Sequence, residues 1–242
     1  MNKIQVLSAI FILASASGQV MADDYQLETG VSSWNYNAQG YHASELQLDL
    51  KYFFSPVSIE DRPLAVAYFL GRNSNLYGYG FSNIVNHSSN GAGVRAETWK
   101  NDFYSSASYD RVYGTDTYNV NLGYMLNDNC LVTLGATDGD SYTSTSYSGS
   151  AKYVGRLTDK YVNAEASAAR TNDVNYYTLG GDYFYTNAFS LSGAVTHRDA
   201  TTFETKYVFR TQYFLTSRTS VSARFERNLG QDTTYVALST RF

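Results

Sequence analysis

The chain has 242 residues and a formal net charge of −4 at pH 7, from 18 basic and 22 acidic residues, and this acidic balance argues against nucleic acid as a partner. Beyond the first two dozen residues no stretch approaches 18 consecutive apolar residues, so the sequence predicts no transmembrane helix there. If this part of the chain enters a membrane, it does so as β-strands.

The first residues have the features of an export signal. Lys3 gives a basic start, and the apolar run over residues 4–16 is shorter than the roughly 20 residues that a membrane-spanning helix needs. Val20 and Ala22 offer the side chains that signal peptidase accepts at positions −3 and −1. We therefore expect a signal peptide over residues 1–22, with an uncleaved anchor as the alternative, and a barrel over residues 23–242. Loss of Lys3 with the signal would make the net charge −5.

The composition favours strands with one apolar and one polar face. Aromatic residues make up 16% of the chain, with 23 Tyr, whereas there are only 2 Pro. A mean hydropathy of −0.33 in so aromatic a chain fits a wall that is apolar outside and polar inside, although a soluble β-sandwich could share the bias. Cys130 is the only cysteine, so we expect no disulfide, redox chemistry, metal site or cofactor.

The first clear strand, residues 46–54, alternates apolar and polar side chains. Leu48 and Leu50 fall on one face, and Asp49 and Lys51 fall on the other. Each alternating stretch lasts about ten residues, the length that crosses a bilayer at a tilt of about 45°. The same alternation recurs over residues 118–126 and 177–185.

Extending this pattern along the chain predicts an all-β, antiparallel, up-and-down transmembrane β-barrel of fourteen strands, with twelve or sixteen as alternatives. The least regular segment is 64–80, where residues 71–74 could instead form a turn. For residues 103–112 the sequence does not decide which side chains face the lumen. The predicted strands are residues 24–35, 41–54, 64–80, 91–99, 103–112, 117–126, 130–138, 147–157, 161–170, 175–185, 188–197, 203–215, 220–228 and 233–242.

The connections alternate in length, as expected for periplasmic turns and outer loops, and this places both termini on the periplasmic side. Tyr25, Tyr124, Tyr185 and Tyr213 are candidates for a periplasmic aromatic belt, with ordinary sheet packing as the alternative. The tight turns are residues 127–129, 158–160, 186–187 and 216–218, and the longer loops are 82–90, 138–146, 171–175 and 198–202.

The last strand ends in an aromatic residue, Phe242, after the alternating residues Val236, Leu238 and Thr240. This pattern resembles the terminal signal of bacterial outer-membrane proteins, which the barrel-assembly machinery reads. We therefore interpret Phe242 as an assembly signal and expect that machinery as a partner.

Three further segments carry a family resemblance. Residues 52–57 read YFFSPV and residues 62–70 read RPLAVAYFL, followed later by YTLGGDYFYT at residues 177–186. These segments resemble the opening turn and the repeated hairpins of the "putative general bacterial porin" family, and the likeness extends over nearly the whole mature chain. The resemblance implies a barrel and a channel in the outer membrane of a Gram-negative bacterium, without naming a substrate.

A barrel of about fourteen strands should enclose a narrow lumen, since eight strands fill with side chains and 16 to 18 leave an aqueous channel. We expect no plug domain and no large constriction hairpin, so that a gate would come from lumen side chains or short loops. Two interpretations of the charges are open: they select ions, or they pair across the lumen and stiffen the wall. The net charge hints weakly at cation preference. The predicted pore-lining residues are Glu45, Asp49, Lys51, Arg95, Glu97, Lys152, Arg156, Glu165, Asp182, Glu204, Lys206, Arg210, Arg224 and Glu226.

The function that these features favour is a porin-like channel for passive diffusion of ions and small polar solutes. The alternative is a non-conducting barrel with a structural, adhesion or surface-display role. An enzyme is not expected, because His42, His87 and His197 accompany no G-x-S-x-G or H-E-x-x-H motif. The remaining expected partners are outer-membrane lipid, lipopolysaccharide and small hydrophilic solutes, with a homo-oligomer left open.

Overall fold

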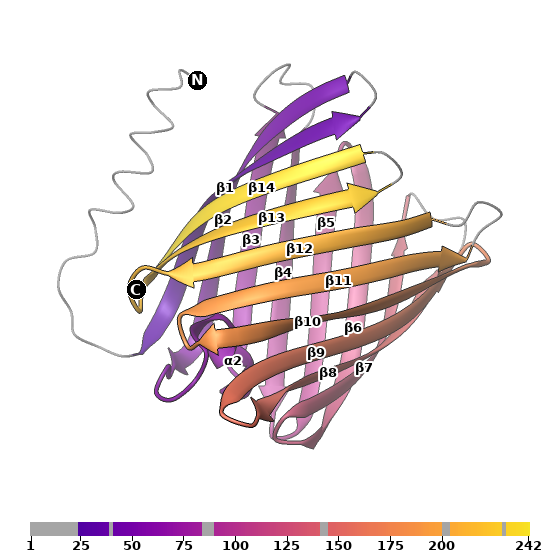
Figure 1. Cartoon of the computed structure of the whole chain (residues 1–242). Helices are drawn as coiled ribbons and strands as arrows, with labels where there is room; N and C mark the ends of the chain where they lie inside the picture. The colour runs from indigo at the N-terminus through magenta and orange to yellow at the C-terminus, as the bar shows by residue number, and fades with distance from the viewer. Residues whose placement is uncertain (1–23, 39–40, 84–89, 141–144, 200–203, 229–230) are drawn as a thin grey trace.

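The chain forms a closed barrel of fourteen antiparallel strands (Figure 1). The computed structural model describes residues 24–38, 41–83, 90–140, 145–199, 204–228 and 231–242. Consecutive strands pair throughout, and β1 pairs with β14 to close the cylinder. The predicted fold class and strand number are confirmed. The predicted signal peptide, residues 1–22, lies outside the described residues.

Most strand boundaries lie within a few residues of their predicted positions. The described part of the chain contains no helix that is long and apolar enough to span a membrane. The strands are β1 (Tyr25–Ala38), β2 (Tyr41–Val57), β3 (Asn75–Asn83), β4 (Asn90–Lys100), β5 (Phe103–Val112), β6 (Thr115–Asn127), β7 (Cys130–Gly139), β8 (Ser146–Leu157), β9 (Lys160–Thr171), β10 (Val174–Thr186), β11 (Phe189–Asp199), β12 (Glu204–Phe214), β13 (Thr219–Asn228) and β14 (Gln231–Arg241).

The alternation in the sequence determines which face of each strand points outward. Leu122, Leu134 and Leu179 are among the most exposed apolar side chains, at 70%, 74% and 69%, because they lie on the outer surface of the wall. Such residues suit contact with lipid, where a charged side chain at the midplane would cost about 2–4 kcal/mol. The polar residues between them therefore face the lumen.

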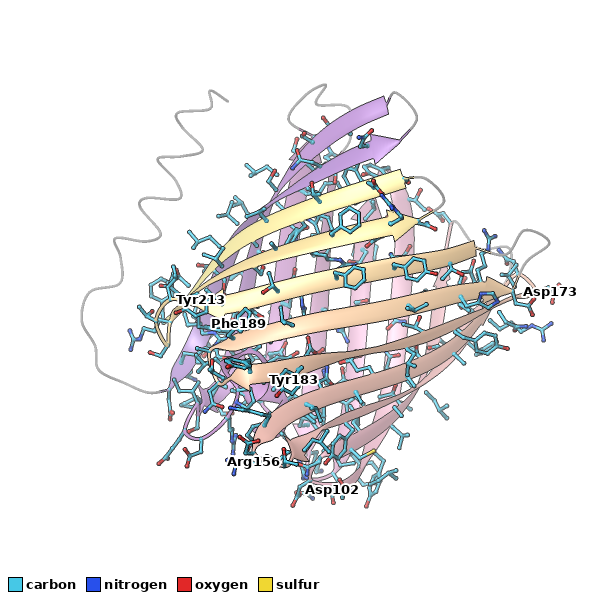
Figure 2. All side chains as sticks on the ribbon, viewed as in Figure 1. Asp102, Arg156, Asp173, Tyr183, Phe189 and Tyr213 are labelled. Carbon is cyan, nitrogen blue, oxygen red and sulfur yellow. The ribbon has the colours of Figure 1, made fainter. Side chains whose placement is uncertain are left out.

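The two rims of the barrel differ in their connections. We call the rim that holds the strand ends next to both chain termini the turn end, and the opposite rim the loop end. Asp102 and Arg156 lie at the turn end and Asp173 lies at the loop end (Figure 2). The prediction of a longer loop at residues 171–175 was wrong, since Asn172 and Asp173 form a tight turn with φ of 47° and 65°.

The segment predicted as a strand over residues 64–80 is a strand only in its second half. Residues 64–70 form the 3-10 turn η1 (Leu64–Val66) and the helical turn α2 (Ala67–Leu70), and β3 begins at Asn75. The physical reason is that residues 64–70 are apolar at nearly every position, so neither face of a strand built from them could point into a wet lumen. Instead this segment packs inside the barrel at the turn end, near the label α2 in Figure 1.

Phe242 lies at the seam where the cylinder closes. Its backbone N–H donates to the carbonyl of Leu27 at 2.8 Å, and its own carbonyl accepts from Gln26 N–H at 2.8 Å and Leu27 N–H at 3.1 Å. Arg241, only 3% exposed, points inward and pairs with Glu28 of β1 at 2.7 Å. The last two residues therefore tie β14 to β1 through both backbone and side chain.

Three of the four proposed belt tyrosines face outward, and one does not. Tyr124, Tyr185 and Tyr213 are 44%, 60% and 51% exposed on the outer surface, where Tyr213 is visible near the turn end in Figure 2. Tyr25 is only 4% exposed and packs edge-on against Phe53, with ring centroids 5.4 Å apart. The belt prediction is wrong for Tyr25, because this residue contributes to the apolar interior of the turn end.

Candidate functional site

A connection between β2 and β3 folds into the lumen, and we call these residues, 58–74, the plug segment. Val66 and Phe69 are buried at 6% and 4% exposure in a cluster that gathers inward side chains from five strands. Burial of side chains of this size contributes about 1.5–3 kcal/mol each. The expectation of no large constriction hairpin was therefore wrong, because this long connection packs inside the barrel. The cluster partners from the wall are Tyr104, Met125, Leu131, Val154 and Phe184.

Polar contacts fix the plug segment to the turn end. The N–H of Leu64 donates to the carbonyl of Asn187 at 2.8 Å, and the hydroxyl of Tyr161 donates to the carbonyl of Asp61 at 3.2 Å. Arg72, with φ of 51°, bridges two neighbouring turns through ion pairs to Asp102 at 2.7 Å and Asp128 at 2.8 Å. The segment is thus attached around much of the rim.

Described residues line two cavities in the lumen. The inner chamber, of about 750 Å³, lies against the plug segment and is lined by strands β4 to β13. The outer chamber, of about 780 Å³, lies nearer the loop end and is lined by β1 to β3, the end of β5, the turn after it and the start of β14. The two chambers differ sharply in chemistry, and we describe them separately.

Charged side chains of both signs line the inner chamber, and nearly all are paired. Arg95 pairs with Glu97 at 3.1 Å, and Lys152 pairs with Glu165 at 2.8 Å. Glu226 accepts from two cations at once, from Lys206 at 2.6 Å and Arg224 at 2.7 Å. This pairing, partly within a strand and partly between adjacent strands, stiffens the wall and leaves only a small excess of positive charge.

Asp182 forms the most complete polar network of the inner chamber. Its carboxylate accepts from Arg210 at 2.8 Å, from the amide of Asn163 at 2.6 Å and from the hydroxyl of Ser192. The side chain of Asp182 is 7% exposed, whereas that of Arg210 is 44% exposed. Asp182 therefore holds Arg210 in place while the guanidinium faces the cavity.

Two lysines lie over aromatic rings of the plug segment. The Lys51 ammonium is 3.7 Å from the ring centroid of Tyr68, and the Lys152 ammonium is 5.0 Å from that of Phe69. Both distances are within the range of cation–π attraction. These lysines connect the charged wall to the plug segment.

The outer chamber is lined by aromatic rings and one buried carboxylate. Tyr77, Tyr79 and Phe81 follow one another along the inner face of β3, with ring centroids 5.9 and 6.4 Å apart. Glycines on the neighbouring strand make room for these rings, since a Cβ at Gly91 would overlap Phe81 and a Cβ at Gly93 would overlap Tyr79. The remaining aromatic lining is Trp34, Tyr36 and Tyr113.

Among the described residues that line the outer chamber, Glu45 alone is charged. It is 4% exposed. Its carboxylate accepts hydrogen bonds from the hydroxyls of Tyr36 at 3.1 Å and Tyr113 at 2.5 Å. Tyr113 belongs to the tight turn after β5 and has φ of 54°, so the turn directs this ring across the loop end toward β2.

The predicted pore-lining residues are distributed between these regions. Glu45 lies in the outer chamber, Asp49 is half-buried on the inner face of β2, and Lys51 contacts the plug segment. Arg156 is exposed at the turn end over the ring of Tyr161, and the side chain of Glu204 lies outside the described part. The inner chamber brings together Arg95, Glu97, Lys152, Glu165, Asp182, Lys206, Arg210 and Arg224, and Glu226 pairs with the last of these and with Lys206.

Sequence reasoning missed the aromatic lining because it counted only ionisable residues as lumen-facing. A signal was present in β3, where Tyr77, Tyr79 and Phe81 alternate with Gly78 and Gly80. Because the side chains of a strand alternate between its two faces, three bulky rings on one face and glycines on the other show that the rings share a surface.

The structure describes only one of the three histidines, the residues considered as catalytic bases, in full. His197 lies on β11 opposite Tyr177 of β10, while His87 and the side chain of His42 lie outside the described part of the chain. Among the residues that the structure describes, no three His, Cys, Asp or Glu side chains gather closely enough to hold a metal ion.

Comparison with known proteins gives a family and several structural relatives. A family model described as "Putative general bacterial porin" matches residues 1–148. The crystal structure of the outer membrane protein Omp33 of Acinetobacter baumannii is similar, with a TM-score of 0.77 and 26% identity over 91% of this chain and 99% of that chain. No curated protein matches the chain.

Two more distant structures share the fold alone. A triple mutant of the Rhodopseudomonas blastica porin has a TM-score of 0.53 and 10% identity over 89% of this chain and 99% of its own. The low-pH structure of Pseudomonas putida OprB has a TM-score of 0.52 and 8% identity over 100% of this chain and 98% of its own.

Proposed function

The chain belongs to the general bacterial porin family, and we propose that solutes cross its barrel through the outer and inner chambers in turn, with the plug segment setting the size limit. As a porin it is a diffusion channel of the bacterial outer membrane for small polar solutes rather than an enzyme. The observation that carries the proposed route is that both cavities lie inside one closed barrel and have polar lining.

The lining charges support weak rather than strong ion selectivity. A ring of unpaired charges of one sign would select ions, but the inner chamber holds five basic and three acidic lining residues, most of which are paired at 2.6 to 3.1 Å. Paired charges have short-ranged fields, and salt screens them further. We therefore expect a small preference for anions at the inner chamber, opposite to the direction that the net charge alone suggests.

The plug segment also favours a second candidate function. Because Val66 and Phe69 pack against side chains from strands far around the wall, a firmly docked plug segment would leave little room for solutes at the turn end. A barrel sealed in this way would serve a structural, adhesion or surface-display role. Conductance separates the two candidates.

Export and assembly complete the proposal. Residues 1–22 would direct the chain across the inner membrane and be removed, and the turn end, with both mature termini, would face the periplasm. Phe242 would present the carboxy-terminal signal to the barrel-assembly machinery before its backbone hydrogen bonds to β1 form the seam. The outward leucines and tyrosines would contact lipid and, in the outer leaflet, lipopolysaccharide.

The test is the conductance of the purified mature protein in planar bilayers. We expect discrete current steps that are small for a porin. In a potassium chloride gradient we expect a small reversal potential whose sign indicates a preference for anions. A membrane that stays sealed at all voltages, with a protein that still shows the heat-dependent gel mobility of a closed barrel, would shift the function to the non-conducting role.

A further inference from the structure

We propose that the outer chamber is a binding site for small organic cations, such as alkylammonium compounds, held by its aromatic rings and by the charge of Glu45. The inference builds on the proposed function, because it assumes that the lumen is open to solutes from the loop end. It goes further by naming the chemical class that this part of the lumen retains.

The aromatic rings form the first half of the argument. Tyr79 and Phe81 lie nearly parallel, with an interplanar angle of 8°, and Phe81 meets Tyr113 edge-on with centroids 5.8 Å apart. Trp34 lines the same cavity from β1. Trp and Tyr rings attract cations through their electron-rich faces, and a cage of several rings is a common way to recognise an alkylated ammonium group.

The carboxylate of Glu45 forms the second half. Two phenol hydroxyls donate to it, which fixes its position without neutralising its charge. Its surroundings are largely shielded from water, at 4% exposure, so its negative potential reaches further into the cavity than it would at an open surface. A cation in the cavity would therefore be attracted without displacing either tyrosine.

Two further carboxylates lie near the rings of β3. Asp49 lies directly across from Tyr79 on the neighbouring strand, and Asp110 accepts a hydrogen bond from the Tyr79 hydroxyl at 2.8 Å. No ion pair joins Glu45, Asp49 or Asp110 to a basic side chain that the structure describes. The outer chamber is thus a region of negative charge and aromatic surface inside a wall that is elsewhere paired.

Basic residues lie on the side of the rings that faces the inner chamber, where Lys51 and Arg95 are across from Tyr77 on the two neighbouring strands. The guanidinium of Arg224 lies 5.7 Å from the ring centroid of Trp34, at the boundary with the inner chamber, and it is paired with Glu226. None of the described residues that line the outer chamber itself is Lys, Arg or His. The cavity of about 780 Å³ is within the size range of sites for small molecules, so it can admit an alkylammonium ion together with water.

The chain provides a reporter for this site. Its two tryptophans are divided between the chambers, with Trp34 in the outer chamber and Trp99 in the lining of the inner chamber. In a Trp99→Phe background, the fluorescence of Trp34 reports the outer chamber alone. The probes are choline and its neutral isostere 3,3-dimethyl-1-butanol, which has the same shape without the charge.

We expect choline to change Trp34 fluorescence saturably, and the neutral isostere to bind at least about tenfold more weakly, as expected for a desolvated cation–π site beside a carboxylate. Glu45→Gln keeps the hydrogen-bonding shape and should weaken choline binding about tenfold. Glu165→Gln, a matched change in the inner chamber, should leave it unaltered. Phe81→Leu removes a ring that makes no hydrogen bond and should weaken binding about threefold.

Equal binding of choline and its neutral isostere, or choline binding that survives both Glu45→Gln and Phe81→Leu, would overturn the inference. The fluorescence measurement is made on folded protein in detergent and needs no current. A protein that conducts but does not bind choline therefore refutes this inference alone, whereas one that binds choline but leaves bilayers sealed refutes the diffusion route alone.

Discussion

The inner and outer chambers hold their carboxylates in opposite ways. In the inner chamber Asp182, Glu165 and Glu226 each face a basic side chain at 2.6 to 2.8 Å. In the outer chamber Glu45 is held by two phenol hydroxyls and no described basic side chain. Ion pairing makes a wall rigid and nearly neutral, whereas hydroxyl donors fix a carboxylate and leave its charge available. In the same barrel, carboxylates thus stabilise the wall in one chamber and are available to bind a ligand in the other.

The two chambers also differ in what lies next to them. The apolar side chains that seat the plug segment, such as Met125, Leu131 and Phe184, all lie at the turn end of their strands. At the loop end the inward positions hold aromatic and polar residues instead. The cluster of large apolar side chains in the lumen therefore lies at the end that the plug segment covers.

Undocking the plug segment should give the largest change. Phe69→Asp places a carboxylate in the apolar cluster and removes a buried ring, a loss of about 3–5 kcal/mol for the ring alone. The segment should leave its seat while the barrel stays closed, and single-channel conductance in planar bilayers should rise several-fold. Phe69→Leu keeps an apolar side chain and should behave like the unmodified protein.

Unchanged conductance in Phe69→Asp, with normal heat-dependent gel mobility, would show that the plug segment does not limit the current. The two chambers would then differ in their charges, and the plug segment would not be a constriction beside the inner chamber.

The plug segment shows where prediction from the sequence fails. Strand periodicity was sufficient for the number of strands and for the closed barrel, because each strand alternates independently. It could not distinguish an apolar strand from an apolar helical turn over residues 64–70, since a short apolar run has no periodicity of its own. Met125, Leu131 and Phe184 on lumen-facing positions were the missing signal, because apolar residues facing water need a cover.

Removal of a paired carboxylate and removal of an unpaired carboxylate of the lumen should have unequal effects on stability. Asp182→Ala leaves Arg210, Asn163 and Ser192 without their shared acceptor, and we expect unfolding in urea to become easier by about 1–3 kcal/mol. Asp49→Ala removes a carboxylate that has no ion pair with a described residue, and should change the free energy of unfolding by less than about 1 kcal/mol.

An equal decrease in the free energy of unfolding of Asp182→Ala and Asp49→Ala would contradict the distinction between paired and unpaired carboxylates. The measurement is reversible unfolding of the refolded barrel in lipid or detergent, followed by tryptophan fluorescence, with Asp159→Asn in an exposed turn as the control.

The candidate site was predicted in part. The charged residues of the inner chamber could be predicted from the alternation of side chains along each strand, because a charge on the lipid face is costly and the strand register is regular. Their pairing does not follow, since it depends on which strands are neighbours and on side-chain conformations. The aromatic lining was missed for a different reason: Tyr suits both a lipid interface and a lumen, so residue type alone does not assign Tyr77 or Tyr79 to a face.

The smallest expected effect concerns ion selectivity. Lys206 and Arg224 share the single carboxylate of Glu226, so together they leave one positive charge in excess. The double variant Lys206→Gln and Arg224→Gln should shift the reversal potential toward cations, equivalent to about a twofold change in the permeability ratio. The effect is small because Glu226 partly neutralises the two basic side chains and salt screens the remaining charge. Neutralising Arg170 and Asp173, a pair exposed at the loop end, should leave the reversal potential unaltered, and an equal shift there would mean that the inner chamber does not control selectivity.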